Sequence, residues 1–293
     1  MKKMKAYIKL MRIHHYIKNG LVFAAVACSG QLFQKGKFLA GLAGFFAFCM
    51  TSSLVYVVND ICDREKDRRH PTKCNRPIAS GAVSVNSARI LAVILGLGAI
   101  GLNALVFHLN SSLLLTLYLI LNLAYSFGLK NIPLLDVTIL SAGFLIRTLY
   151  GAIITEIIIS NWLYLTVITL AFYFSLGKRR NEIQRVRGGE TRKVLQFYTP
   201  SFLDKNMYMC LALANTFYAL WCMDERTTQH YSGISLILTV PIVLVITMRY
   251  SMDIEGDSDG DPVEVVIHDK SLLILCIAYL TMMFIILYFV SGQ

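Results

Sequence analysis

The sequence contains few charged residues. Lys, Arg, Asp and Glu together make up 16% of its 293 residues, whereas an average soluble chain carries about 25%. Apolar residues make up 56% of the chain, which leaves too little polar surface for an ordinary water-soluble domain. The composition therefore indicates an integral membrane protein.

Three further features are missing from the sequence. The basic N-terminus is not followed by a short apolar core with a small-residue cleavage site, so we expect no cleavable signal peptide. The seven cysteines lack the spacing of metal ligands or disulfides and are interpreted as apolar packing residues. Neither a low-complexity stretch nor a soluble domain is evident, so we expect a single domain over residues 1–293.

Long apolar runs recur along the chain. A helix that crosses the bilayer needs about 20 mostly apolar residues, and such a segment must be helical because lipid cannot satisfy its backbone groups. The sequence predicts nine transmembrane helices, of which the first is short: 20–34, 38–58, 88–107, 111–128, 134–156, 161–177, 207–223, 231–249 and 271–290.

The basic residues are distributed unevenly between the connections. Most of the 28 Lys and Arg residues precede the first span or lie in the long polar loops 59–87, 178–206 and 250–270. This positive-inside pattern places the N-terminus and these loops in the cytoplasm. Nine spans then place the C-terminus outside the inner (cytoplasmic) membrane. The net charge of +10 is thereby explained without a nucleic-acid partner.

The most informative polar stretch follows the second predicted span. Asn59, Asp63 and Asp67 are four residues apart, so a continuing helix stacks them on one face. Their oxygens suit Mg²⁺, which leaves its other positions to water and phosphate oxygens. Downstream, Arg68, Lys73 and Arg76 can donate to a diphosphate. A solvated loop would explain the basic residues, but not the carboxylates at the membrane boundary.

The pattern Asn-Asp-x-x-Asp-x-x-x-Asp, followed by Arg-x-His-Pro-x-Lys-x-x-Arg-Pro-Ile-Ala-Ser-Gly over residues 59–81, resembles the signature of the UbiA superfamily of intramembrane prenyltransferases. The likeness extends over nearly the whole chain. It implies an all-α bundle of nine transmembrane helices, with a central cavity open to the cytoplasm and laterally to lipid. It also implies that Asn59, Asp63 and Asp67 are metal-binding catalytic residues, with Asp60 in the substrate site.

A second motif departs from the family pattern. Typical members carry a second Asp-rich motif after a later helix, whereas residues 175–182 here read Ser-Leu-Gly-Lys-Arg-Arg-Asn-Glu. This segment, with residues 12–19, 144–147 and 260–264, resembles the branch of polyprenyl-phosphate phosphoribosyltransferases typified by decaprenyl-phosphate phosphoribosyltransferase. The branch implies Mg²⁺-dependent transfer of 5-phosphoribose from 5-phosphoribosyl diphosphate (PRPP) to a polyprenyl phosphate, in cell-envelope precursor synthesis.

This chemistry needs little proton transfer. The acceptor phosphate oxygen is already anionic, so stabilising the departing pyrophosphate is the main task. Arg147 lies within a span, where a charge is costly, and is interpreted as functional, with a structural hydrogen-bonding role as the alternative. Asp136, near a helix start, is interpreted as structural. The remaining substrate-binding candidates are Lys18, Asn19, Tyr125, Lys130, Lys178, Arg179, Arg180 and Glu182.

Alternatives stay open at this point. One is transfer of a prenyl chain from its diphosphate to an aromatic acceptor, as in quinone or haem pathways, against which the cationic second motif argues. Another is transport of an anionic metabolite, against which the long loops on one face argue. The acidic segment 253–261 fails a calcium-loop pattern at Val266, where a Glu is required, and is interpreted as a solvated loop that acts as a lid. Lipid length, the number of metal ions and assembly into a homo-oligomer are left open.

Overall fold

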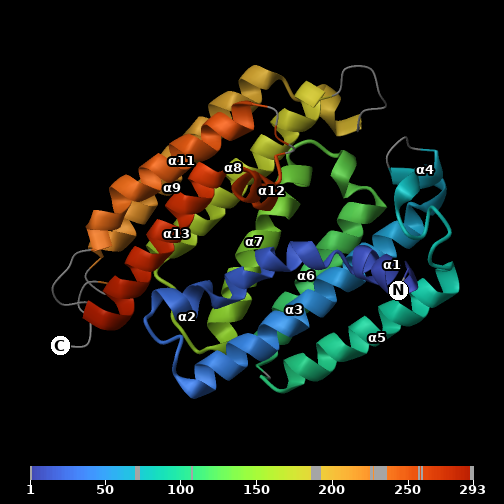
Figure 1. Ribbon diagram of the computed structural model, residues 1–293, viewed down its shortest axis with the longest axis horizontal. Helices are drawn as coiled ribbons and strands as arrows, with labels where there is room; N and C mark the ends of the chain where they lie inside the picture. Colours follow the sequence, from blue (N-terminus) through green and yellow to red (C-terminus); the bar gives the residue numbers. More distant parts are fainter. Residues whose placement is uncertain are drawn as a thin grey trace. The chain divides into compact units, whose positions relative to one another are not determined.

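The computed structural model describes residues 2–69, 73–106, 108–185, 193–224, 227, 236–256, 258 and 260–290. Every regular element within these ranges is helical (Figure 1). Helices satisfy their own backbone groups, which is what a chain in lipid requires. The all-α prediction is therefore confirmed.

Among the residues that the structure describes, six helices are long and apolar enough to cross a membrane, which indicates a multi-pass membrane protein. Two more helices, α8 (Asn161–Arg185) and α9 (Pro200–Met223), are also long but less apolar. The count of nine spans stays a prediction. The six candidate spans are α3 (Lys35–Cys62), α5 (Val85–Ala104), α6 (Leu109–Phe127), α7 (Leu135–Ile154), η5 with α11 (Leu236–Thr239 and Val240–Glu255), and α13 (Lys270–Ile285) with most of the π-helical turn Ile286–Val290.

The first predicted span, 20–34, does not form one continuous helix. The chain passes from a 3-10 helix, η1 (Ile13–Phe23), into the five-residue α2 (Ala24–Cys28) and then into turns before α3. The apolar run is shorter than the 20 or so residues that a spanning helix needs. Its backbone also packs closely: a Cβ at Gly151 of α7 would lie 1.9 Å from the Val22 carbonyl oxygen.

The chain divides into two compact units. Unit 1 comprises residues 1–26, 32–128 and 146–157. In it, α3 packs along α5 and contacts α1 (Lys2–Met11), η1 and α6. A cluster of buried apolar side chains supports the polar end of α3: Leu10, Val57, Ile78, Val83, Ala88 and Leu95. The short elements α4 (Arg64–Arg68) and η2 (Lys73–Asn75) follow α3 directly.

Unit 2 comprises residues 27–31, 129–145 and 158–293. In it, α8 and α9 pack along one another, and α11 contacts both, together with α12 (Pro262–His268) and α13. Two short 3-10 helices, η3 (Leu129–Asn131) and η4 (Lys193–Phe197), contact each other. The boundary between the units falls within α7, whose first half belongs to unit 2 and whose second half belongs to unit 1.

Candidate active site

The Asp-rich segment of unit 1 keeps a helical register across a break. Helix α3 ends at Cys62, and Asp63 (φ −87°, ψ 3°) links it to α4. The Asp63 N–H nevertheless donates to the Asn59 carbonyl (2.9 Å), and the Asp67 N–H donates to the Asp63 carbonyl (2.8 Å). Asn59, Asp63 and Asp67 therefore follow one another at intervals of one helical turn, as their spacing predicts.

Two carboxylates of this segment are buried and bound to arginines. Asp60 and Asp67 are 2% and 3% exposed. Arg76 Nη1 donates to Asp67 Oδ2 (2.8 Å) and to Asp60 Oδ1 (3.3 Å), and Arg12 Nη2 also donates to Asp60 Oδ1 (2.9 Å). Burial makes a carboxylate charge costly, and a nearby guanidinium offsets part of that cost. Arg76, expected to bind a diphosphate, thus holds the acids in place, and Arg12 was missed because it lies 48 residues from its partner.

Two further basic candidates are Arg68, the last residue of α4, and Lys73. The Arg68 side chain is 42% exposed, donates to the Ala79 carbonyl (3.2 Å) and contacts Glu65 (3.3 Å). Lys73 lies in η2 and is half-buried. Residues 70–72, between Arg68 and Lys73, lie outside the described residues. Arg68, with 42% of its side chain exposed against 25% for Arg76, is therefore better placed than Arg76 to meet an external anion.

The donor atoms of this segment are of the kind that Mg²⁺ uses. Asn59, Asp63 and Asp67 offer only oxygen ligands, at successive turns. In the part of the chain that the structure describes, no three His, Cys, Asp or Glu side chains lie close enough to enclose a metal ion by themselves. The residues present therefore fit a partial coordination shell, which phosphate oxygens and water would complete, as is usual for Mg²⁺.

Two candidates inside unit 1 bind each other. Arg147 is 7% exposed and Asn19 is 1% exposed. Arg147 Nε donates to Asn19 Oδ1 (2.8 Å) and Arg147 Nη2 donates to Tyr118 Oη (2.9 Å), with the guanidinium 5.1 Å from the Phe48 ring centroid. The Asn19 amide also donates to Ser52 Oγ (3.2 Å). This geometry matches the structural alternative for Arg147, because the guanidinium ties α7 to η1 and α6.

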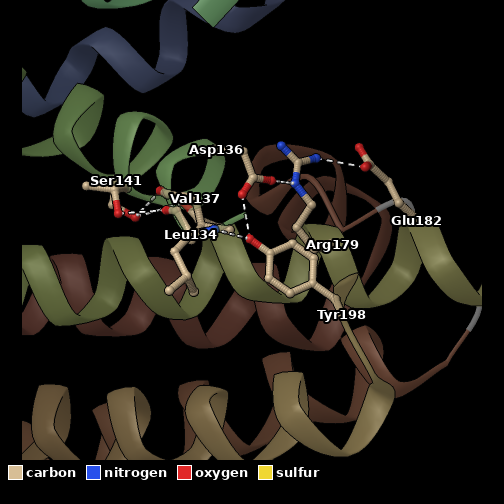
Figure 2. Close-up of polar contacts among 9 residues, drawn as sticks. Leu134, Asp136, Val137, Ser141, Arg179, Glu182 and Tyr198 are labelled. Carbon is tan, nitrogen blue, oxygen red and sulfur yellow. Dashed lines mark hydrogen bonds and ion pairs between the residues drawn. The ribbon is translucent and has the colours of Figure 1, made fainter. Parts of the chain in front are cut away.

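In unit 2, the second motif lies on α8, which continues beyond its apolar part as far as Arg185. Arg179 is fully buried and donates to Asp136 Oδ2 (2.5 Å) through Nε and to Glu182 Oε2 (2.7 Å) through Nη1 (Figure 2). The Tyr198 hydroxyl donates to the other Asp136 oxygen (2.5 Å) and accepts from the Leu134 N–H (2.7 Å). Burial, and then the hydrogen bond to Asp136, raise the pKa of Tyr198 to about 12, so this hydroxyl keeps its proton.

The neighbours of Arg179 turn to other partners. Arg180 Nε donates to Asp204 on α9 (2.5 Å), and its Nη1 donates to the Ile254 carbonyl (3.3 Å). The Lys178 ammonium lies 4.0 Å from Asp261 Oδ2, and its side chain is 36% exposed, against 0% for Arg179 and 11% for Arg180. Lys178 is thus the most accessible of these three cations.

The loop before α12 packs closely on this motif. Gly260 (φ 71°) approaches so near that a Cβ on it would lie 2.8 Å from Lys178 Cα. The Asn181 amide donates to the Ser258 hydroxyl (2.7 Å), whereas its buried Oδ1 has no hydrogen-bond partner among the described residues. Asn181 was missed by sequence reasoning, although it lies one turn beyond Lys178. Residues 257 and 259 of the predicted lid lie outside the described residues.

The model of the UbiA prenyltransferase family matches residues 20–194. The chain belongs to this family. Its similar relatives include decaprenyl-phosphate phosphoribosyltransferases, each covering 93% of this chain. The protein from Corynebacterium glutamicum is 34% identical, with 83% of its length covered. Those from Mycolicibacterium smegmatis and Mycobacterium tuberculosis are 32% and 31% identical, with 89% and 91% covered.

Solved structures of UbiA proteins share the fold. A UbiA homolog from Archaeoglobus fulgidus, bound to GPP and Mg²⁺, matches with a TM-score of 0.71 over 96% of this chain and 99% of that one, at 17% identity. A digeranylgeranylglyceryl phosphate synthase matches with a TM-score of 0.66 over 98% and 99%, at 16% identity. At these identities the likeness establishes the UbiA fold alone.

The remaining candidates of this UbiA chain lie in two 3-10 helices and near the end of α6. Lys18 lies in η1, Tyr125 lies near the end of α6, and Lys130 lies in η3. All three are half-buried. Lys18 and Tyr125 belong to unit 1 and Lys130 belongs to unit 2.

Proposed function

We propose that this chain transfers 5-phosphoribose from PRPP to a polyprenyl phosphate and releases pyrophosphate. The observation that carries the proposal is the chemistry of the second motif on α8. Its one acid, Glu182, is bonded to Arg179, and cations occupy positions 178–180. In the described part of the chain, this motif therefore offers no carboxylate cluster for a second group of metal ions. The relatives named as decaprenyl-phosphate phosphoribosyltransferases support the same activity.

We assign Mg²⁺ binding to Asn59, Asp63 and Asp67. The metal would supply positive charge for the pyrophosphate that leaves the ribose. Arg76 binds Asp67, one of these ligands, and Arg76 and Arg12 both bind the neighbouring Asp60, so the segment stays ordered while it lacks substrate. Because the two arginines offset part of the negative charge of Asp60 and Asp67, the polyanionic substrate meets less repulsion at the Asp-rich segment.

The remaining charged candidates bind and orient the two substrates. Arg68 and Lys73 donate to the diphosphate of PRPP, and Lys18 and Lys178 neutralise its other phosphate charge. Tyr125 and Lys130 contact the ribose or its phosphate. The polyprenyl phosphate presents an oxygen that is anionic at neutral pH, so the site must orient this oxygen rather than deprotonate it.

The whole of residues 1–293 acts as one catalytic domain in this proposal. The family match over residues 20–194 includes segments of both compact units, and the relatives align with 93% of the chain. We further propose nine crossings of the inner membrane around a cavity open to the cytoplasm and to lipid. The N-terminus and the charged motifs then face the cytoplasm, and the C-terminus lies outside.

The test uses detergent-purified protein, Mg²⁺, radiolabelled PRPP and polyprenyl phosphates of several lengths. We expect label to enter the organic phase with release of pyrophosphate, and EDTA to abolish both. The control is Asp63→Asn protein purified in parallel. If folded wild-type protein transfers no ribose but moves a labelled prenyl chain from its diphosphate to aromatic acids, the chain is a prenyltransferase and the proposal is wrong.

A further inference from the structure

The three consecutive cations of the second motif, residues 178–180 of α8, contact acids on different elements of unit 2. Arg179 points to Asp136 at the start of α7, and Arg180 points to Asp204 on α9 (Figure 2 shows the first of these contacts). Lys178 faces Asp261, just before α12. Because successive residues of a helix are about 100° apart around its axis, Arg179 and Arg180 hold α8 from two sides.

Hydrogen bonds around Asp136 connect three segments of unit 2. Asp136 is fully buried, and its two oxygens accept from Arg179 and from Tyr198. Tyr198 in turn accepts from the N–H of Leu134, whose φ of 65° is a left-handed conformation that leucine rarely adopts. Ser141 Oγ donates to Ser175 Oγ (3.0 Å) and joins α7 to α8 once more. The start of α7, the end of α8 and the chain before α9 are thus fixed together.

We propose that Asp136, Arg179 and Tyr198 form a positioning unit that sets the rotation of the last turns of α8 and so directs Lys178 at the phosphoribosyl donor. This inference rests on the proposed function for the identity of the donor. The Arg179 side chain has no exposed surface and is bonded to Asp136 and Glu182. In this proposal it therefore affects the donor indirectly, by setting the position of Lys178. In this proposal Arg179 has an indirect role instead of the expected substrate contact, and the expectation that Glu182 contacts substrate stays a prediction.

The decisive variant is the double substitution Asp136→Asn with Arg179→Gln. Arg179→Gln alone leaves the buried Asp136 without its cation, and Asp136→Asn alone leaves Arg179 with Glu182 but without its buried partner, whereas the double variant removes both charges of the buried pair. We expect the double variant to fold better than either single variant. We also expect its KM for PRPP to rise about tenfold, with kcat and the KM for polyprenyl phosphate changed less than about twofold.

Two further variants separate positioning from the alternatives. Tyr198→Phe removes one hydrogen bond to Asp136 and no charge, and we expect it to raise the KM for PRPP about threefold. A normal KM in Tyr198→Phe, with a raised KM in the double variant, would instead make Arg179 a direct ligand. The matched control is the double variant Arg249→Gln with Asp269→Asn, which removes another close ion pair of unit 2 (2.5 Å). We expect this control to leave the KM for PRPP unchanged.

Amide hydrogen exchange tests the positioning unit without the reaction. In the Asp136→Asn/Arg179→Gln variant, the amides of residues 178–185 should exchange faster, while those of α5 keep the wild-type rate. Unchanged exchange at 178–185 would overturn the inference, whether or not the wild type transfers ribose. Faster exchange there, in a protein whose wild type does not use PRPP, would keep the positioning unit and reject the proposed function. Faster exchange with a normal KM for PRPP would make the unit merely structural and overturn the inference.

Discussion

Replacing Arg76 by glutamine removes the guanidinium that Asp60 and Asp67 share. Asp60 keeps its bond to Arg12, whereas Asp67 loses the cation 2.8 Å away. Breaking a buried ion pair by removing one partner costs about 3–5 kcal/mol. Because the Arg76 side chain is 25% exposed, water can partly replace it, and we expect a loss of about 2–3 kcal/mol.

The assay is thermal unfolding of the detergent-solubilised protein at a fixed heating rate. For a chain of this size each kcal/mol shifts the Tm by about 2–4 °C, so Arg76→Gln should unfold roughly 5–10 °C lower than the wild type. Arg68→Gln is the matched control, because the Arg68 and Glu65 side chains are 42% and 70% exposed and such surface pairs contribute about 0–1 kcal/mol. Equal shifts in the two variants would refute the structural role of Arg76.

The same variant has a consequence for metal binding. Without Arg76, the carboxylates of the Asp-rich segment carry more uncompensated negative charge, which favours a divalent cation. We expect half-maximal activity of Arg76→Gln at a lower Mg²⁺ concentration than in the wild type. Direct binding of the diphosphate by Arg76 would instead raise the KM for PRPP and leave the Mg²⁺ dependence unchanged.

The remaining predictions concern the metal ligands, the buried arginine and the topology. Asp63→Asn and Asp67→Asn should each lower ribose transfer at least about a hundredfold; near-normal transfer in either variant would remove that residue from the metal site. Arg147→Met should lower the Tm while leaving the KM for PRPP within about twofold, since Arg147 binds Asn19 and Tyr118; a selective rise in KM would restore its substrate role. A periplasmic reporter fused after Gln293 should be active, and a reporter active only in the cytoplasm would show an even number of crossings.

The apolar runs predicted where most helices lie, because hydrophobicity and helix length are local properties of the sequence. The runs at 88–107, 111–128 and 134–156 correspond to α5, α6 and α7 within a few residues. The run at 20–34 forms part of a 3-10 helix, a short α-helix and turns instead of one continuous helix, and Val22 within it lies close to Gly151. A contact between residues so far apart in the sequence leaves no periodic pattern from which it could be predicted.

The partners of the charged residues were the part that could not be predicted. The pairs Arg12–Asp60, Arg179–Asp136 and Arg147–Asn19 are 48, 43 and 128 residues apart in sequence. A motif shows that a cation is present, but only the fold shows whether a carboxylate of the same chain already binds it. The spacing of Asn59, Asp63 and Asp67 could be predicted because helical register is local.

A charged residue at the end of a membrane helix can serve the substrate or the protein, and burial largely decides which. An unpaired charge in a low-dielectric interior is costly, so Asp67, Asp136 and Arg179, all nearly or fully buried, are bound by opposite charges. Cations with partly exposed side chains, such as Arg68 and Lys178, lose less free energy when they exchange one partner for another. A polyanionic substrate can therefore recruit these exposed cations at little cost, while the buried pairs keep the helices that carry them in place.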